Sequence, residues 1–153
     1  MSISYGHPDP GLRFDFYDGV PPKRLIAWVI DLGFTALIAL PFILPFFAIG
    51  LVLLFPLLVI PVIWGITGFL YRWATLANGS ATWGMRLMAI ELRDTDGQHI
   101  SGSTAFRHTL GSTLSFGFPL IQAISVLFMA TGDKGQGLTD MVLGTVMLNR
   151  AAP

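Results

Sequence analysis

The chain has 153 residues, of which 53% are hydrophobic and only 12% charged, and its nine basic and nine acidic residues leave no net charge. An ordinary soluble domain carries about a quarter charged residues, so this composition is typical of a protein that faces lipid. The zero net charge disfavours nucleic acid as a partner, and the lack of cysteine excludes disulfides and thiolate metal sites.

The first 22 residues form a polar tail that is rich in proline and glycine. A cleavable signal peptide would place a short apolar core near the start, whereas the first apolar stretch here is too long for such a core. We therefore expect that stretch to stay in the membrane as a span. This divides the chain into a tail, residues 1–22, and a membrane domain, residues 23–150.

A long apolar run separates Arg24 from Arg72, and its one charged residue is Asp31. Because one span needs about 20 residues, the run predicts two membrane helices, residues 25–48 and 51–73, with a connection near Pro41 to Gly50. A buried soluble hairpin is the alternative, but nothing else in the chain could cover it.

Basic residues predict the orientation of this hairpin. They lie outside its two ends and are absent from its connection. Since positively charged residues concentrate on the cytoplasmic side of membrane proteins, both ends of the hairpin and the N-terminus are expected to face the cytoplasm.

A more polar segment follows the hairpin. Alternating apolar and polar residues over 86–93 predict a half-exposed strand, and residues 94–97 predict a turn. Residues 98–101 are a candidate second short strand. Ser103 is expected to cap a helix that begins near Ala105.

The third apolar segment, residues 106–130, is interrupted by Gly117-Phe118-Pro119. Its two halves of about eleven residues are each too short to cross a bilayer, so the segment either spans as a whole or forms a re-entrant or surface-lying hairpin. Residues 144–148 predict a strand, and pairing with residues 86–93 would favour the version that does not cross. The predicted fold is an all-α integral membrane protein with a transmembrane helical hairpin, this third segment and a small cytoplasmic β element.

Asp31 is the most informative residue, because a carboxylate within a membrane costs several kcal/mol unless it is paired, protonated or hydrated. In the returning helix, Thr67 and Tyr71 would lie at a similar depth and are its candidate hydrogen-bond partners. Arg24 and Arg107 are its candidate ion-pair partners. Two roles stay open for Asp31: a structural anchor that fixes the register of the helices, and an ion or proton site.

By its position alone, Asp140 is predicted to be a cap or turn residue. Together with Arg24 and Asp31, however, it gives the chain a pattern that resembles the RDD family of bacterial membrane proteins. That family is named for an arginine that begins the first membrane helix, an aspartate within this helix and a second aspartate near the C-terminal end. Here the first two lie in residues 24–31, and the third begins the Asp-x-x-x-Gly-Thr-Val pattern of residues 140–146.

The resemblance covers about residues 20–149 and includes two further features. Residues 81–87 are similar to the family's Thr-x-Gly-Lys segment, and Arg107 resembles a basic residue common before the third apolar segment. Two positions depart from the family pattern. Met85 replaces the usual basic residue after Gly84, and Thr139 stands where a histidine often precedes the second aspartate, which weakens any site that would use those side chains.

The resemblance implies the bacterial cytoplasmic membrane and a transport role, with cation–proton exchange for some members. The expected function is an oligomeric transporter of a small ion or solute, in which Asp31 exchanges a proton or monovalent cation and Arg24 tunes its charge. The alternative is a membrane scaffold or accessory subunit in which Arg24, Asp31, Asp140 and Arg107 are structural.

Other functions find little support in the residues. The three histidines lack metal-ligand spacing, and no nucleophile or paired carboxylates stand out. We therefore expect no enzyme activity, no cofactor and no metal. The expected partners are the lipid bilayer, further copies of the chain or a larger membrane complex, and a monovalent cation or proton.

Overall fold

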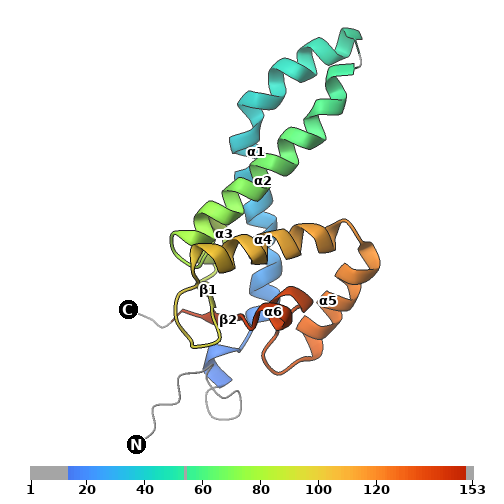
Figure 1. Ribbon diagram of the computed structural model, residues 1–153. Helices are drawn as coiled ribbons and strands as arrows, with labels where there is room; N and C mark the ends of the chain where they lie inside the picture. Colours follow the sequence, from blue (N-terminus) through green and yellow to red (C-terminus); the bar gives the residue numbers. More distant parts are fainter. Residues whose placement is uncertain (1–13, 54, 151–153) are drawn as a thin grey trace, which may run out of the picture.

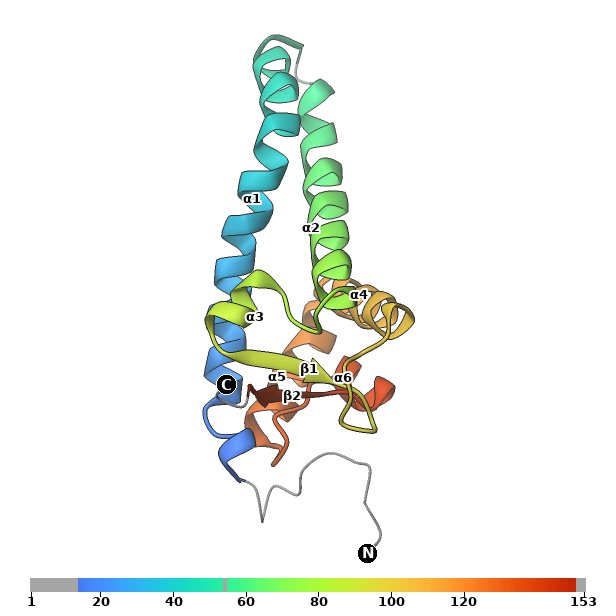
Figure 2. The ribbon, with the colours of Figure 1, turned by 90° about the vertical axis from the view of Figure 1, so that its left-hand side faces the viewer.

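The structure, a computed structural model, describes residues 14–53 and 55–150, so most of the predicted polar tail lies outside the described residues. Helices α1 (Val20–Leu53) and α2 (Ile60–Ala77) form an antiparallel hairpin, joined through the 3₁₀ helix η2 (Phe55–Val59). The ends of these helices enter a base made of η1 (Phe14–Phe16), α3 (Trp83–Leu87), β1 (Ile90–Arg93), α4 (Gly102–Phe116), α5 (Pro119–Thr131), α6 (Leu138–Leu143) and β2 (Val146–Asn149). The hairpin projects from this base (Figures 1 and 2).

The turn of the hairpin comes later than predicted. Helix α1 continues through Pro41 and Pro45 and past Gly50 to Leu53, so the connection is not the segment from Pro41 to Gly50. Proline removes one helical hydrogen bond, but apolar membrane-type helices tolerate this loss more readily than helices in water. Pro61 lies in the first turn of α2, where the missing N–H has no helical partner to lose.

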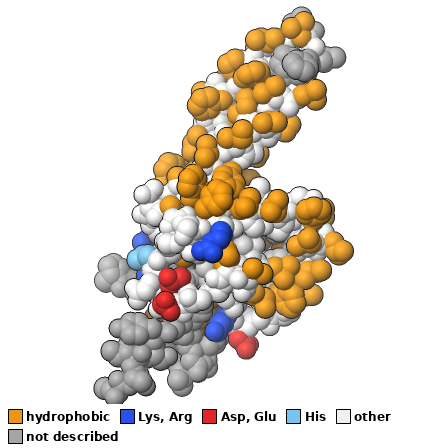
Figure 3. Space-filling model, in the orientation of Figure 1, with side chains coloured by type: hydrophobic (Ala, Val, Ile, Leu, Met, Phe, Trp, Pro, Cys, Tyr) orange, Lys and Arg blue, Asp and Glu red, His pale blue; other side chains and the backbone are white. Residues whose placement is uncertain are grey.

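The projecting part of the hairpin exposes apolar side chains on all sides. Leu37, Leu40, Leu44, Val62 and Ile66 are each at least half exposed. Orange hydrophobic side chains cover the hairpin in Figure 3, whereas the charged side chains gather on the base. Two stretches, Val20–Gly50 and Leu57–Ala77, are long and apolar enough to cross a membrane, which agrees with the two predicted apolar segments.

The hydrophobic core lies in the base, where the ends of α1 and α2 meet the two strands. Ala27, Leu76, Ile90, Leu92 and Met147 are almost completely buried there. Alanine on α1 lets the neighbouring elements approach closely, while the larger aliphatic side chains of the strands fill the centre. This core fixes the hairpin to the base.

Strands β1 and β2 pair in antiparallel fashion, with Ile90 opposite Asn149 and Arg93 opposite Val146. The predicted pairing is confirmed, but both strands are short. Residues 86–89 are not part of a strand: Arg86 and Leu87 end α3, and the positive φ of Ala89 (54°) lies outside the β region, so the strand begins only at Ile90.

The segment after β1 differs from the prediction in two details. Residues 94–97 form the predicted turn, in which the Gly97 N–H donates to the carbonyl of Asp94. The second strand predicted for residues 98–101 is reduced to a single bridge between Arg93 and His99. Ser101, not Ser103, caps α4, since its hydroxyl accepts a hydrogen bond from the Thr104 N–H.

The third apolar segment is a bent pair of helices. The chain direction bends by 118° between α4 and α5, with the break at the predicted Gly117-Phe118-Pro119. Helix α4 runs across the foot of the hairpin, and α5 turns back beside α6 (Figure 1). Because β1 precedes this pair and β2 follows it, the segment begins and ends at the same end of the molecule.

Candidate functional site

Asp31 is buried where α1, α2 and α3 meet. Its Oδ1 accepts hydrogen bonds from the Tyr71 hydroxyl (2.6 Å) and the Gly84 N–H (2.9 Å). Its Oδ2 accepts one from the Thr82 hydroxyl (2.6 Å) and lies 3.8 Å from the Arg72 guanidinium. Groups of the chain itself therefore surround both oxygens of this carboxylate.

The start of α3 is built to hold Asp31. The Thr82 hydroxyl accepts a hydrogen bond from the Met85 N–H, which caps α3, and donates its own hydrogen to the carboxylate. A Cβ on Gly84 would lie 2.2 Å from the Ala27 carbonyl oxygen and 2.7 Å from Asp31 Oδ1. Only glycine allows this approach, which gives a physical reason for the Thr-x-Gly segment.

Asp140 forms a second buried cluster, which joins α1, α4 and α6. Its Oδ2 accepts hydrogen bonds from Arg24 Nη1 (2.6 Å) and the Gly137 N–H (3.0 Å). Its Oδ1 lies 2.8 Å from His108 Nε2 and accepts a longer bond from the Thr145 hydroxyl (3.3 Å). Asp140 thus orders its own short helix, as predicted from its position, and also connects that helix to the hairpin.

The surroundings of Asp140 keep it ionised. Burial by itself raises the pKa of this carboxyl, but the charge of Arg24 and the hydrogen bond to His108 outweigh burial and hold the pKa well below its usual range. An ionised carboxylate can only accept hydrogen bonds, so the shared proton belongs to His108 Nε2. Asp140 is therefore not a group that gains and loses a proton near neutral pH.

This lowered pKa predicts how acid affects stability. The folded pKa of Asp140 lies below the unfolded value of about 3.9, so its stabilising contribution is complete above that pH and is lost as pH falls towards the folded pKa. We expect Asp140→Asn to melt at a lower temperature than wild type in detergent at pH 7, and this difference to shrink below about pH 4. Asp133→Asn, at an exposed position, is the control and should show no such difference; a gap that stays constant with pH would contradict the assignment.

The structure pairs the predicted charged residues differently from the expectation. Arg24 contacts Asp140 rather than Asp31, and Arg107 is exposed and donates to the Ser103 carbonyl of its own helix (3.4 Å). The arginine beside Asp31 is Arg72, so both predicted ion-pair partners of Asp31 have to be corrected. Two turns of helix separate Arg24 from Asp31, and this distance is too long for direct contact.

Of the two predicted hydrogen-bond partners of Asp31, the structure places one in contact with it. Tyr71 donates to Asp31, whereas Thr67 forms no hydrogen bond with it among the described residues, because Thr67 lies one turn before Tyr71 in α2, nearer the tip of the hairpin. Sequence reasoning missed Arg72 and His108 as members of the site. Arg72 directly follows Tyr71, so it lies at about the same depth of the hairpin as Asp31. This depth is the sequence signal that could have identified it.

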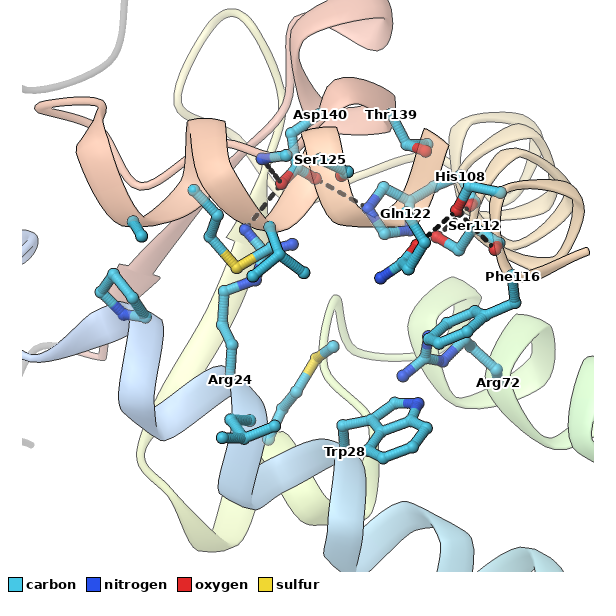
Figure 4. A pocket seen from close by; sticks show the side chains of 18 of the residues that line it. Arg24, Trp28, Arg72, His108, Ser112, Phe116, Gln122, Ser125, Thr139 and Asp140 are labelled. Atoms are coloured by element: carbon cyan, nitrogen blue, oxygen red, sulfur yellow. Dashed lines mark hydrogen bonds and ion pairs between the residues drawn. The ribbon is translucent and has the colours of Figure 1, made fainter. Parts of the chain in front are cut away.

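A cavity of about 410 Å³ lies beside both clusters, between α1, α4 and α5. Its polar wall includes Arg24, Arg72, His108, Gln122 and Asp140, and its apolar wall includes Trp28 and Phe116. The rings of Trp28 and Phe116 stack with centroids 5.6 Å apart. Figure 4 shows Arg24 and Arg72 on opposite sides of this cavity. No group of three or more His, Asp or Glu that could hold a metal ion occurs in the part of the chain that the structure describes.

The apolar hairpin and the buried charge clusters at its foot define a small, mostly helical protein of membrane type. The chain belongs to the RDD family, whose sequence model matches residues 20–144. This match confirms the resemblance inferred from the sequence. No curated protein matches the chain, and neither does any solved structure.

Proposed function

We propose that the hairpin crosses the bacterial cytoplasmic membrane and that the base lies at the cytoplasmic face. The part of α1 from Leu32 to Leu53 rises about 33 Å at 1.5 Å per residue, which matches a hydrocarbon core of about 30 Å. Lys23, Arg24 and Arg72 are at the foot of the hairpin, and the sequence between the latter two contains no other basic residue, as the positive-inside rule requires. In this placement Asp31 lies at the boundary of the membrane rather than deep within it.

The bent pair α4–α5 fits a position along this boundary. It exposes large apolar side chains, including Leu110, Leu114, Leu120 and Leu127. Figure 3 shows these hydrophobic surfaces adjoining the foot of the hairpin. Both ends of the pair lie on the same side of the membrane as the sheet. A re-entrant or surface-lying hairpin therefore explains the apolar surface without a third crossing.

Cysteine labelling tests this topology, because the native chain has no cysteine. We expect Leu53→Cys, near the tip of the hairpin, to react with a membrane-impermeant maleimide only from outside the cell. Asp96→Cys and Asp133→Cys, which lie before α4 and after α5, should react only in inside-out vesicles. Labelling of the latter two positions from opposite sides would contradict the proposed placement.

We infer that the Arg/Asp set is structural and that the protein acts as a membrane scaffold or accessory subunit. The observation that carries this inference is the complete occupation of both carboxylates. Each of their four oxygens is engaged by two groups of the chain, so neither needs a bound cation. The apolar surface of the hairpin suits association with further copies of the chain or with a larger membrane complex.

Transport of a small ion or solute by an oligomer is the second candidate, favoured by the cavity beside the two clusters. Wild type and Asp31→Asn would be reconstituted into proteoliposomes with an internal pH dye and given pulses of Na⁺, K⁺ or Li⁺. A structural role predicts no cation-dependent proton movement with wild type. Movement with wild type that disappears in a folded, equally inserted Asp31→Asn protein would favour exchange at Asp31.

A further inference from the structure

Arg72 faces the cavity with unused hydrogen-bonding capacity. Its guanidinium carries five N–H donors, yet it forms no hydrogen bond with another described residue, and its nearest acidic contact is Asp31 at 3.8 Å. Asp31 already accepts hydrogen bonds from Tyr71, Thr82 and Gly84, and at 3.8 Å its contact with Arg72 is an ion pair without a hydrogen bond. The side chain of Arg72 is 18% exposed and lines the cavity, so its remaining donors can meet an acceptor there.

Other polar groups on the same wall are also unsatisfied. The Gln122 carbonyl oxygen accepts a bond from Ser115, but its amide nitrogen has no acceptor among the described residues, and neither has the indole N–H of Trp28. His108 Nδ1 is buried without a partner. The ionisable groups of the wall are Arg24, Arg72, His108 and Asp140; Asp140 is paired with Arg24, whereas the ion-pair partner of Arg72 is Asp31, so Arg72 is the cationic group of this wall that has donors left for a ligand.

The rest of the cavity is apolar. Trp28, Phe116, Leu25 and Val126 form a continuous hydrocarbon and aromatic wall next to these donors. A small inorganic anion alone would leave this wall uncovered, whereas a molecule with an anionic head and an apolar body would cover it. Gln122 extends between Arg24 and Arg72 in Figure 4, which places the amide where the head would lie.

We propose that this cavity binds a phosphate-bearing amphiphile. The phosphate accepts hydrogen bonds from Arg72 and Gln122, and the apolar part lies along Trp28 and Phe116. A phospholipid at the membrane boundary and a soluble phosphate compound are the two sources of this chemistry. The proposal goes beyond the structural role of the Arg/Asp set, because it assigns a ligand to Arg72, whose guanidinium forms no hydrogen bond with another described residue.

Native mass spectrometry of the full chain in a non-ionic detergent tests the proposal with three probes. Phosphatidylglycerol carries the phosphate and acyl chains, diacylglycerol with the same chains lacks the phosphate, and inorganic phosphate lacks the chains. Gln122→Glu introduces a negative charge into the cavity without removing either ion pair. Gln98→Glu makes the same change at an exposed turn and is the matched control.

We expect wild type and Gln98→Glu to bind phosphatidylglycerol in preference to diacylglycerol, and Gln122→Glu to bind it about tenfold more weakly or worse. Inorganic phosphate should compete only weakly, because it cannot cover the apolar wall; if it binds as well as phosphatidylglycerol, the ligand is not an amphiphile and the proposal is overturned. If Gln122→Glu does not fold, Gln122→Leu, which removes the amide donor and the acceptor of Ser115 without adding a charge, should still weaken binding. Equal binding of phosphatidylglycerol and diacylglycerol, or no effect of either Gln122 variant, would overturn the proposal. Because the assay is done in detergent, its failure would leave the proposed topology standing.

Discussion

Asp31→Asn is expected to reduce the free energy of unfolding by about 3–5 kcal/mol, the usual cost of removing one partner from a buried ion pair. The amide keeps one acceptor oxygen for Tyr71 and Gly84, but its NH₂ group points donors towards Arg72. The guanidinium then stays buried without a compensating charge. Much of the loss therefore comes from Arg72, not from the hydrogen bonds of Asp31.

The measurement is the melting temperature and the yield of monodisperse protein in detergent. Asp96→Asn, at an exposed turn position, should behave like wild type. Adding Arg72→Met to Asp31→Asn should recover part of the loss in stability, because it removes the unpaired buried charge. The double-mutant cycle then measures the coupling between the two residues. Wild-type stability of Asp31→Asn would show that the carboxylate is not a structural anchor.

Gly84→Ala is expected to be the most damaging single-methyl change, with a loss of about 3 kcal/mol or more. The new Cβ would lie 2.2 Å from a backbone carbonyl oxygen of α1, so α3 has to move away from the helix. That movement also takes the Gly84 N–H from Asp31. Thermal unfolding in detergent measures the loss.

Gly33→Ala is the matched control for this change, because it lies two residues after Asp31 on α1 and a Cβ there would meet nothing within 4 Å. Alanine is favoured over glycine inside a helix by about 0.5–1 kcal/mol, so this variant should be neutral or slightly more stable. Equal effects of the two substitutions would mean that the close approach of α3 to α1 is not required.

The sequence predicts the elements better than their boundaries. Apolar composition over residues 25–73 is enough to indicate a hairpin, and two isolated strands in one short chain have few partners other than each other. The turn of the hairpin was misplaced because Pro41, Pro45 and Gly50 are helix breakers in water, whereas α1 contains all three. Local propensity is a weaker guide where neighbouring apolar surface favours the helix.

The charge pairs were harder to predict, because they depend on the rotation of each helix about its axis. Tyr71 was found from its depth in an antiparallel hairpin, but depth alone does not distinguish Arg72 from Arg107 as the partner of Asp31. Arg24 and Asp140 are 116 residues apart in the chain. Their contact requires α6 to pack on α4, an arrangement that no local pattern specifies.

The foot of the hairpin depends on residues that are synthesised much later than the hairpin itself. Lys23 donates to the side chain of Asn149 (2.6 Å), Arg24 pairs with Asp140, and β1 pairs with β2. The hairpin therefore leaves the ribosome before the residues that complete its foot have been synthesised. Until residues 140–149 emerge, Arg24 lacks its carboxylate partner and β1 lacks its paired strand, so the foot of the hairpin stays incomplete until this distant segment has been made.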